Sequence, residues 1–219
     1  MAFILNIETA TKNCSVAVAK EGVTIAIKEF AGEGYTHAEK LHVFIEEVLK
    51  QSNIQFKDLN AIAVSMGPGS YTGLRIGVSA AKGLCYALNI PLIAIDTLEL
   101  LARKISITDG VILPMIDARR MESYTAVFNA CYDKIRETKA EIITEGFYNE
   151  TEGTIHLLGD GAAKYHEVLP KGRFVYHEDV VYPSAGEMSA LSYGKYKKSD
   201  TVDVAYFEPY YLKDFIAGK

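Results

Sequence analysis

AIAVSMGPGSYTGLRIG, residues 61–77, places an apolar run directly before a glycine-rich bend. The run 61–66 predicts a buried β-strand, and the pattern from about residue 72 to residue 88 predicts a helix. Glycines in the bend lack a Cβ and permit positive φ or the close approach of another group, while Pro68 stiffens the backbone. We expect the bend to contact a phosphate, a substrate or another protein. Its residues are Gly67, Pro68, Gly69, Ser70, Tyr71, Thr72, Gly73 and Arg75.

The rest of the chain repeats a pattern of short strands and longer amphipathic segments. Thr36 and Glu39 have the spacing of a capping box before an apolar stripe, which predicts a helix over 36–52. The sequence therefore predicts an α/β protein with two related βββαβα halves, 1–108 and 109–219, the second partly degenerate. The expected strands are 3–8, 14–19, 24–30, 61–66 and 90–95 in the first half and 111–117, 123–130 and 135–143 in the second. Residues 156–162 are expected to form a strand and a glycine loop, and a helix is expected over 184–196.

Composition limits the class of protein. The chain has 219 residues, 49% of them hydrophobic, and a formal net charge of −5. It is long enough to bury a core, and no stretch is apolar enough to predict a membrane span. Its three cysteines, Cys14, Cys85 and Cys131, suggest neither a disulfide framework nor a zinc site, so a cytoplasmic location is expected. The negative charge argues against this chain alone binding a nucleic-acid backbone.

A nucleotide site at the glycine bend is one alternative. A dinucleotide fingerprint needs G-x-G-x-x-G, but the interval from Gly69 to Gly73 is one residue too long, although Asp96 stands where a ribose-binding acid would. A P-loop needs Gly-Lys-Ser or Gly-Lys-Thr, and neither sequence follows the glycines. Both kinds of site are disfavoured.

Two carboxylates, Glu8 and Asp117, end the leading strands of the predicted halves. In a duplicated fold they could face one another and hold a metal–phosphate complex. The alternative is that both are simple turn residues. Glycines that would cradle a phosphate are missing after each of them, since the following residues are Thr9-Ala10-Thr11 and Ala118-Arg119-Arg120.

Histidines offer no convergent metal ligands. His37 and His42 are five residues apart and diverge on a helix, and His156, His166 and His177 are isolated along the sequence. We therefore predict no metal site of the chain's own.

A stripe of small and apolar residues runs along the helix after the bend. It can pack on the chain's own sheet or dock a partner, together with the helix over 36–52. On the docking hypothesis, a bulky replacement of Gly77 or Ala81 blocks a partner without unfolding the chain. The predicted interface residues are Leu41, Phe44, Ile45, Val48, Gly73, Gly77, Ala80, Ala81 and Leu84.

Four segments, 4–11, 67–77, 117–122 and 159–162, together resemble the bacterial TsaB family, also called YeaZ. The likeness spans most of the chain and fades after about Tyr165. It implies an actin-like ATPase fold of two ribonuclease-H-like halves and a role in making threonylcarbamoyladenosine in tRNA, beside the anticodon. A vestigial nucleotide cleft would comprise Glu8, Thr9, Asp117, Arg119, Gly159, Asp160 and Gly161.

The resemblance also implies that catalysis belongs to a sister protein, TsaD, which carries a His-x-Glu-Gly-His metal motif. Here the corresponding residues are Thr97-Leu98-Glu99-Leu100-Leu101, so Thr97 and Leu101 replace both histidines and only Glu99 persists. We expect a noncatalytic, essential subunit that binds and supports TsaD, with no peptidase activity.

The same resemblance implies several partners. These are a TsaD-type catalytic subunit, a TsaE-type ATPase, tRNA through the complex, and a second copy of the chain when it is alone. ATP or ADP with Mg²⁺ would act at the level of the complex, with no cofactor of the chain's own.

The alternative function is a nucleotide-dependent hydrolase or kinase that uses Glu8 and Asp117. Five basic residues form either a small basic surface or a solvated charged face: Arg119, Arg120, Lys195, Lys197 and Lys198.

Overall fold

The computed structural model describes residues 1–32, 36–144, 146, 151, 153–169 and 172–213. These residues form two compact units. Unit 1 comprises Met1–Thr97 and Ser184–Tyr210, and unit 2 comprises Leu98–Pro183 and Tyr211–Lys219. In the described part of the chain, no helix is both long enough and apolar enough to cross a membrane.

Unit 1 contains a five-stranded sheet in the order β3-β2-β1-β4-β5. The central strand, β1, pairs antiparallel with β2 and parallel with β4. The strands are β1 (Phe3–Glu8), β2 (Asn13–Lys20), β3 (Val23–Ala31), β4 (Ala61–Gly67) and β5 (Leu92–Asp96).

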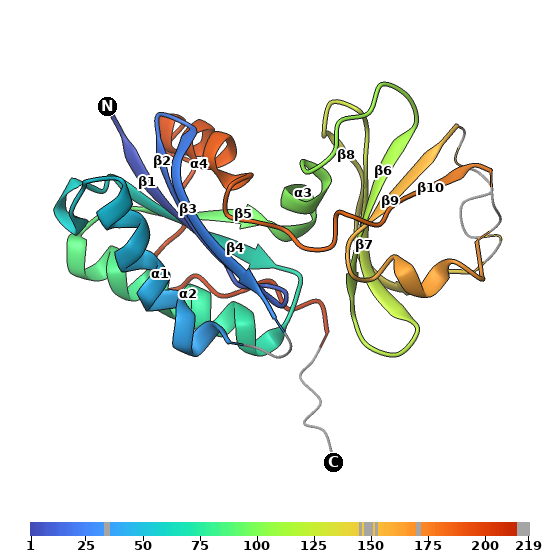
Figure 1. Cartoon of the computed structure of the whole chain (residues 1–219), viewed down its shortest axis with the longest axis horizontal. Helices are drawn as coiled ribbons and strands as arrows, with labels where there is room; N and C mark the ends of the chain where they lie inside the picture. Colours follow the sequence, from blue (N-terminus) through green and yellow to red (C-terminus); the bar gives the residue numbers. More distant parts are fainter. Residues whose placement is uncertain (33–35, 145, 147–150, 152, 170–171, 214–219) are drawn as a thin grey trace, which may run out of the picture. The chain divides into compact units, whose positions relative to one another are not determined.

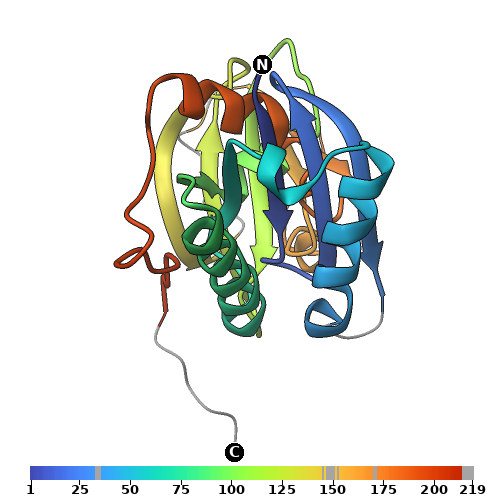
Figure 2. The ribbon, with the colours of Figure 1, turned by 90° about the vertical axis from the view of Figure 1, so that its left-hand side faces the viewer.

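Two helices, α1 (His37–Gln51) and α2 (Tyr71–Leu88), cover one face of this sheet (Figures 1 and 2). The short 3₁₀ helix η1 (Phe56–Asp58) follows α1. Leu5 and Ile7 of β1 pack with apolar residues of both helices in one buried cluster. Both predicted helices are confirmed. The capping box before α1 is wrong, because the Thr36 side chain makes no capping hydrogen bond.

Helix α4 (Met188–Lys197) and the segment before it pack on the strands of the same sheet through polar side chains. Side chains alternate along a strand, so Asn6 and Glu8 point away from the face that carries Leu5 and Ile7. Asn6 Nδ2 donates to Ser189 Oγ at 3.3 Å, and the Ala185 N–H donates to Ser15 Oγ at 3.0 Å.

Unit 2 contains a second five-stranded sheet with the same plan, in the order β8-β7-β6-β9-β10. Again the central strand, β6, pairs antiparallel with its first neighbour and parallel with the other. The predicted actin-like fold with two related ribonuclease-H-like halves is confirmed. The strands are β6 (Val111–Asp117), β7 (Glu122–Phe128), β8 (Lys134–Ile142), β9 (Ile155–Leu158) and β10 (Phe174–His177).

Two features distinguish the sheets. Where α2 connects β4 to β5, the described residues between β9 and β10 form only the 3₁₀ helix η2 (Ala163–Tyr165). The helices that follow the fifth strands are exchanged: α3 (Thr97–Ala102) follows β5 but contributes Leu98, Leu101 and Ala102 to a buried cluster of unit 2, whereas α4 follows β10 and belongs to unit 1.

The predicted halves, 1–108 and 109–219, describe the order of the chain rather than these compact units. The helix predicted over 184–196 is present as α4, but it packs in unit 1. Ser184, which precedes the helix, and Ser189 within it bond to β-strand residues of that unit, and Ser184 Oγ donates to Glu29 Oε2 at 2.6 Å.

Candidate functional site

The glycine bend packs against the turn between β1 and β2. A Cβ on Gly73 would lie 2.1 Å from the Thr9 carbonyl oxygen, and a Cβ on Gly77 would lie 2.2 Å from Thr9 Oγ1. Thr9 Oγ1 donates to the Gly73 carbonyl at 2.8 Å, and the Ser70 N–H donates to the Ala10 carbonyl at 2.7 Å. Ser70 Oγ also accepts from the Gly73 N–H and so caps α2. The glycines thus allow α2 to touch the chain's own turn.

The start of the bend is also occupied by the chain itself. Gly67 has a φ of 112°, and a Cβ there would lie 2.7 Å from the Tyr210 carbonyl oxygen. The Tyr210 N–H donates to the Met66 carbonyl at 2.7 Å. Of the predicted bend residues that point outward, Arg75 donates to the Tyr71 hydroxyl at 2.7 Å on the exposed side of α2. The backbone that we expected to meet a ligand or partner meets other parts of unit 1.

This packing changes the predicted partner interface. Most of its residues are buried within unit 1, and only Phe44, Ala80 and Leu84 are partly exposed. A bulky side chain at Gly77 would collide with Thr9, so the expectation that it leaves the fold intact is wrong. The buried interface residues are Leu41, Ile45, Val48, Gly73, Gly77 and Ala81.

Glu8, at the end of β1, is completely buried. Its Oε1 accepts a hydrogen bond from the Ala10 N–H at 2.5 Å, and its Oε2 has no hydrogen bond of normal geometry to the described residues. Burial raises the pKa of Glu8 to about 7, with a smaller increase from Glu187 and opposing contributions from Ala10 and Ser65. With this pKa, the carboxyl group gains or loses its proton as the pH passes through neutrality.

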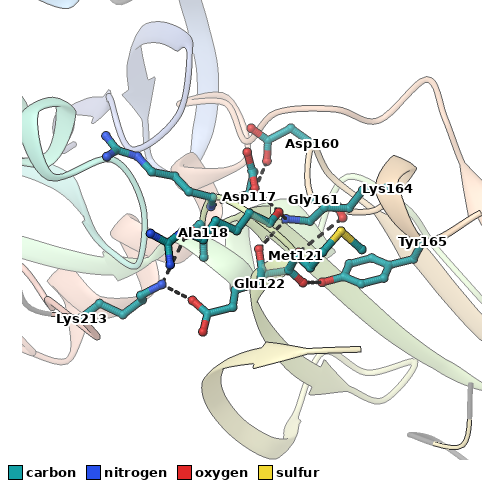
Figure 3. Close-up of polar contacts among 12 residues, drawn as sticks. Asp117, Ala118, Met121, Glu122, Asp160, Gly161, Lys164, Tyr165 and Lys213 are labelled. Atoms are coloured by element: carbon teal, nitrogen blue, oxygen red, sulfur yellow. Dashed lines mark hydrogen bonds and ion pairs between the residues drawn. The ribbon is translucent and has the colours of Figure 1, made fainter. Parts of the chain in front are cut away.

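Asp117 holds the equivalent position at the end of β6, and its environment is the opposite (Figure 3). Its side chain is about half exposed, and Oδ1 accepts hydrogen bonds from Lys164 Nζ at 2.7 Å and from the Arg119 N–H at 3.0 Å. Its own N–H donates to Asp160 Oδ1 at 2.9 Å. A lysine therefore neutralises this carboxylate inside unit 2.

The turn between β6 and β7 is held by side chains that the sequence did not single out. Lys164 donates to the carbonyls of Arg120 and Glu122, and the Tyr165 hydroxyl donates to that of Met121 (Figure 3). Lys213 bonds to the Glu122 carboxylate, and this hydrogen bond and charge lower the pKa of Glu122. No local motif identifies these residues, because they lie more than 40 positions from the turn.

The predicted glycine loop completes the same region. Gly159 has a φ of 102°, and a Cβ there would lie 2.2 Å from the Met115 carbonyl oxygen. The Gly161 N–H donates to that carbonyl at 3.0 Å. Within unit 2 the structure therefore brings together Asp117, Arg119, Gly159, Asp160 and Gly161, while Glu8 and Thr9 belong to unit 1.

Arg119 and Arg120 both adopt left-handed backbone conformations, with φ of 68° and 52°. For a residue with a Cβ this costs about 1–2 kcal/mol, and Gly, Asn or Asp are its usual occupants. Both side chains are exposed. Neither guanidinium makes a hydrogen bond or ion pair with the described residues, although Arg120 contributes to the lowered pKa of Glu122.

The described residues contain no group of three or more His, Cys, Asp or Glu side chains arranged to hold a metal ion. His156 and His177 are not isolated as predicted, since their Nδ1 and Nε2 atoms lie 3.0 Å apart on neighbouring strands. For a magnesium–nucleotide complex the carboxylates fit poorly, because Glu8 is buried with its pKa raised to about 7 and Asp117 is paired with Lys164. Neither turn by itself offers a free carboxylate ligand.

The residues that correspond to the predicted sister-protein metal motif serve packing and local bonding. Thr97 Oγ1 accepts a hydrogen bond from the Gly67 N–H at 3.1 Å, and Leu101 is fully buried in the core of unit 2. Glu99 accepts hydrogen bonds from Arg103 one turn later in the chain.

Comparisons with known proteins agree with the resemblance seen in the sequence. The family model described as TsaD: tRNA N6-adenosine threonylcarbamoyltransferase matches residues 34–206. The chain is 31% identical to the tRNA threonylcarbamoyladenosine biosynthesis protein TsaB of Escherichia coli (strain K12), over 99% of this chain and 96% of that protein. It is 40% identical over 107 residues to the tRNA N6-adenosine threonylcarbamoyltransferase of Bacillus thuringiensis (strain Al Hakam), which covers 42% of this chain and 31% of that one.

Among solved structures, YeaZ from Pseudomonas aeruginosa superposes with a TM-score of 0.85 at 23% identity, covering 97% of this chain and all of that one. That likeness shows the fold, and the identity to the Escherichia coli relative over nearly the whole length shows the family. The chain therefore belongs to the TsaD family that the model describes and, within it, to the TsaB group of tRNA threonylcarbamoyladenosine biosynthesis proteins.

Proposed function

We propose that the chain is a noncatalytic subunit of the machinery that makes threonylcarbamoyladenosine beside the anticodon of tRNA, acting in the cytoplasm by binding a TsaD-type catalytic subunit. The observation that carries this proposal is membership of the TsaB group combined with the loss of both motif histidines. Thr97 and Leu101 replace them: Thr97 accepts a hydrogen bond from the Gly67 N–H, and Leu101 packs in the apolar core of unit 2. A leucine cannot ligate a metal.

The outer surface of α1 and α2 is the best docking site for this partner. The two helices contact one another and share one face of the sheet (Figure 2). Val43 is 50% exposed and Tyr86 is 86% exposed, and both lie outside the buried stripe. An exposed tyrosine beside small residues is the kind of anchor that dominates an interface. The TsaD family model matches residues 34–206, which include both helices, so a TsaD-type partner can offer a related pair of helices.

Gly83 provides a clean test of that surface. It is exposed on α2, three residues before Tyr86, and a Cβ there would meet nothing within 4 Å. We expect Gly83→Lys to fold normally and to weaken binding of the catalytic subunit at least tenfold, with a parallel loss of modified nucleoside in a reconstituted reaction. Isothermal titration calorimetry and nucleoside analysis by mass spectrometry measure the two effects.

Gly194→Lys is the matched control, because Gly194 lies on α4 and also has open space around its Cβ position. It should bind the catalytic subunit normally. Equal binding by both variants would place the docking surface elsewhere. Turnover of ATP by the purified chain alone, lost in Asp117→Asn, would instead favour the nucleotide-dependent hydrolase or kinase.

Further partners belong to the same proposal. A second copy of the chain covers the α1–α2 surface when the catalytic subunit is absent, since both occupants would bury the same apolar side chains. Light scattering with and without the catalytic subunit would show the exchange. A TsaE-type ATPase, with ATP or ADP and Mg²⁺, acts at the level of the complex.

A further inference from the structure

The turn between β6 and β7 carries a residue pair that its backbone does not favour. Positive φ values normally select Gly, Asn or Asp, because other side chains are strained in this conformation. Here the two positions are Arg119 and Arg120. Local rules are most often broken where a residue is needed for something other than the fold.

Arginine side chains do not explain the shape of this turn. The carbonyls of Arg120 and Glu122 are held by Lys164, that of Met121 by Tyr165, and that of Ala118 by Lys213 (Figure 3). The guanidinium groups are left exposed and bond to none of the residues that the structure describes. The turn would keep these contacts with other residues at 119 and 120.

The surrounding charges leave the two arginines attractive to anions. Lys164 pairs with Asp117 and Lys213 pairs with Glu122, so the acidic side chains at the two ends of the turn already have cationic partners, while Asp160 accepts a hydrogen bond from the Asp117 N–H. The chain as a whole has a net charge of −5, and this turn is an exposed positive site on an acidic protein. The planar guanidinium of Arg can bind two phosphate oxygens through parallel hydrogen bonds, whereas the ammonium group of Lys acts as a point charge.

We propose that Arg119 and Arg120 bind the phosphodiester backbone of RNA, and that this chain therefore contacts tRNA directly. The proposal rests on the proposed function, which makes tRNA the RNA in question. The shape of the site favours RNA over a free nucleotide. Both arginines and Met121 are exposed at the end of a β-hairpin, whereas a mononucleotide site needs a concave pocket for the base.

The test uses the full chain in complex with its catalytic subunit and a full-length tRNA transcript. The double variant Arg119→Asn with Arg120→Gly places residues that adopt positive φ more readily at both positions and removes both guanidiniums. We expect its midpoint of thermal unfolding to stay level or rise, its Kd for tRNA to increase about tenfold, and the slope of log Kd against log salt to fall by about 2. Fluorescence anisotropy at several salt concentrations measures both quantities.

Lys197→Asn with Lys198→Gly is the control, because it removes the same charge from two exposed lysines at the end of α4. Its tRNA affinity should change less than twofold. A second variant, Arg119→Lys with Arg120→Lys, keeps the charge and should retain most of the salt dependence while binding more weakly than the original chain.

Unchanged tRNA affinity in the Asn-Gly variant overturns the proposal. So does a variant that binds tRNA normally but loses binding of ADP or ATP in calorimetry, because the arginines would then serve a nucleotide. Binding of the catalytic subunit is measured separately. If that binding is absent, the proposed function fails, and anisotropy on the chain alone at low salt still decides whether the arginines bind RNA.

Discussion

The turn between β1 and β2 and the turn between β6 and β7 occupy the same place in two sheets of the same order, yet their chemistry is opposite. Glu8 is completely buried, forms no ion pair with any described residue and has its pKa raised to about 7. Asp117 is about half exposed and paired with Lys164. The first turn is covered by the glycines of α2, and no such helix follows β9 in the described residues. The turn after the first strand is therefore a buried packing contact in unit 1 and a charged, exposed hairpin in unit 2.

Packing around the first turn gives the largest expected effect. Gly73→Ala places a Cβ 2.1 Å from the Thr9 carbonyl oxygen, so α2 must move away from the turn. We expect a loss of more than about 3 kcal/mol in the free energy of unfolding. Chemical denaturation measures it.

Gly83→Ala on the same helix is the control, because its Cβ would meet nothing within 4 Å. Alanine is the better helix former, so this variant should gain about 0.5–1 kcal/mol. If both variants were equally stable, the contact between α2 and Thr9 would not hold unit 1 together.

The next largest expected effect is on the pH dependence of stability, through the protonation of Glu8. Its folded pKa of about 7 exceeds the unfolded value of 4.5, so the folded chain holds this proton more tightly. The stabilisation from the proton is fully present below about pH 4.5 and is lost as the pH rises through 7. Glu8→Gln removes the cost of a buried charge and should be more stable than the original chain at pH 8, by at most about 3 kcal/mol. At pH 5 the difference should be small.

The midpoint of thermal unfolding, measured for Glu8→Gln and for the original chain between pH 5 and pH 8, reports this difference in stability. The control is Glu46→Gln, an exposed position on α1. A Glu8→Gln variant with the same pH profile as the original chain would show that Glu8 stays ionised in the folded state.

The contacts of Lys164 with the turn between β6 and β7 give the smallest expected effect. Lys164→Met removes one ion pair and two hydrogen bonds to carbonyls, and it should destabilise the turn by about 1–2 kcal/mol. Faster hydrogen exchange at residues 117–122, with little change in β8, would report it. Exposed Lys139→Met on β8 is the control, and equal exchange in the two variants would mean that the turn holds without these contacts.

Much of the fold could be read from the sequence, because hydrophobic periodicity is a local property. The strand, bend and helix over 61–88 were recognisable from the continuous apolar run, the glycines and the apolar pattern that follows them. The duplication of the plan followed from the two apolar strands that end in Glu8 and Asp117. The exchange of α3 and α4 was not recognisable, because which sheet a helix covers depends on residues distant in sequence.

The sites were less accessible to sequence reasoning. The small-residue stripe of α2 was consistent both with internal packing and with a partner, and only the position of Thr9 shows that Gly73 and Gly77 pack internally. Lys164 and Lys213 carry no motif, yet they determine the environment of Asp117 and Glu122. Long-range contacts of this kind leave no periodic signal in the chain.

The exchange of helices has a consequence for biosynthesis. A ribosome finishes all five strands of the first sheet by residue 96, but the segment that packs on its polar side chains, Ser184–Lys197, is synthesised much later. Until then Asn6, Glu8 and Ser15 lack the layer that buries them. Nascent chains would therefore hold an incomplete first unit until this segment has been made, and a nonsense mutation before residue 184 would impair the unit whose strands had already been synthesised.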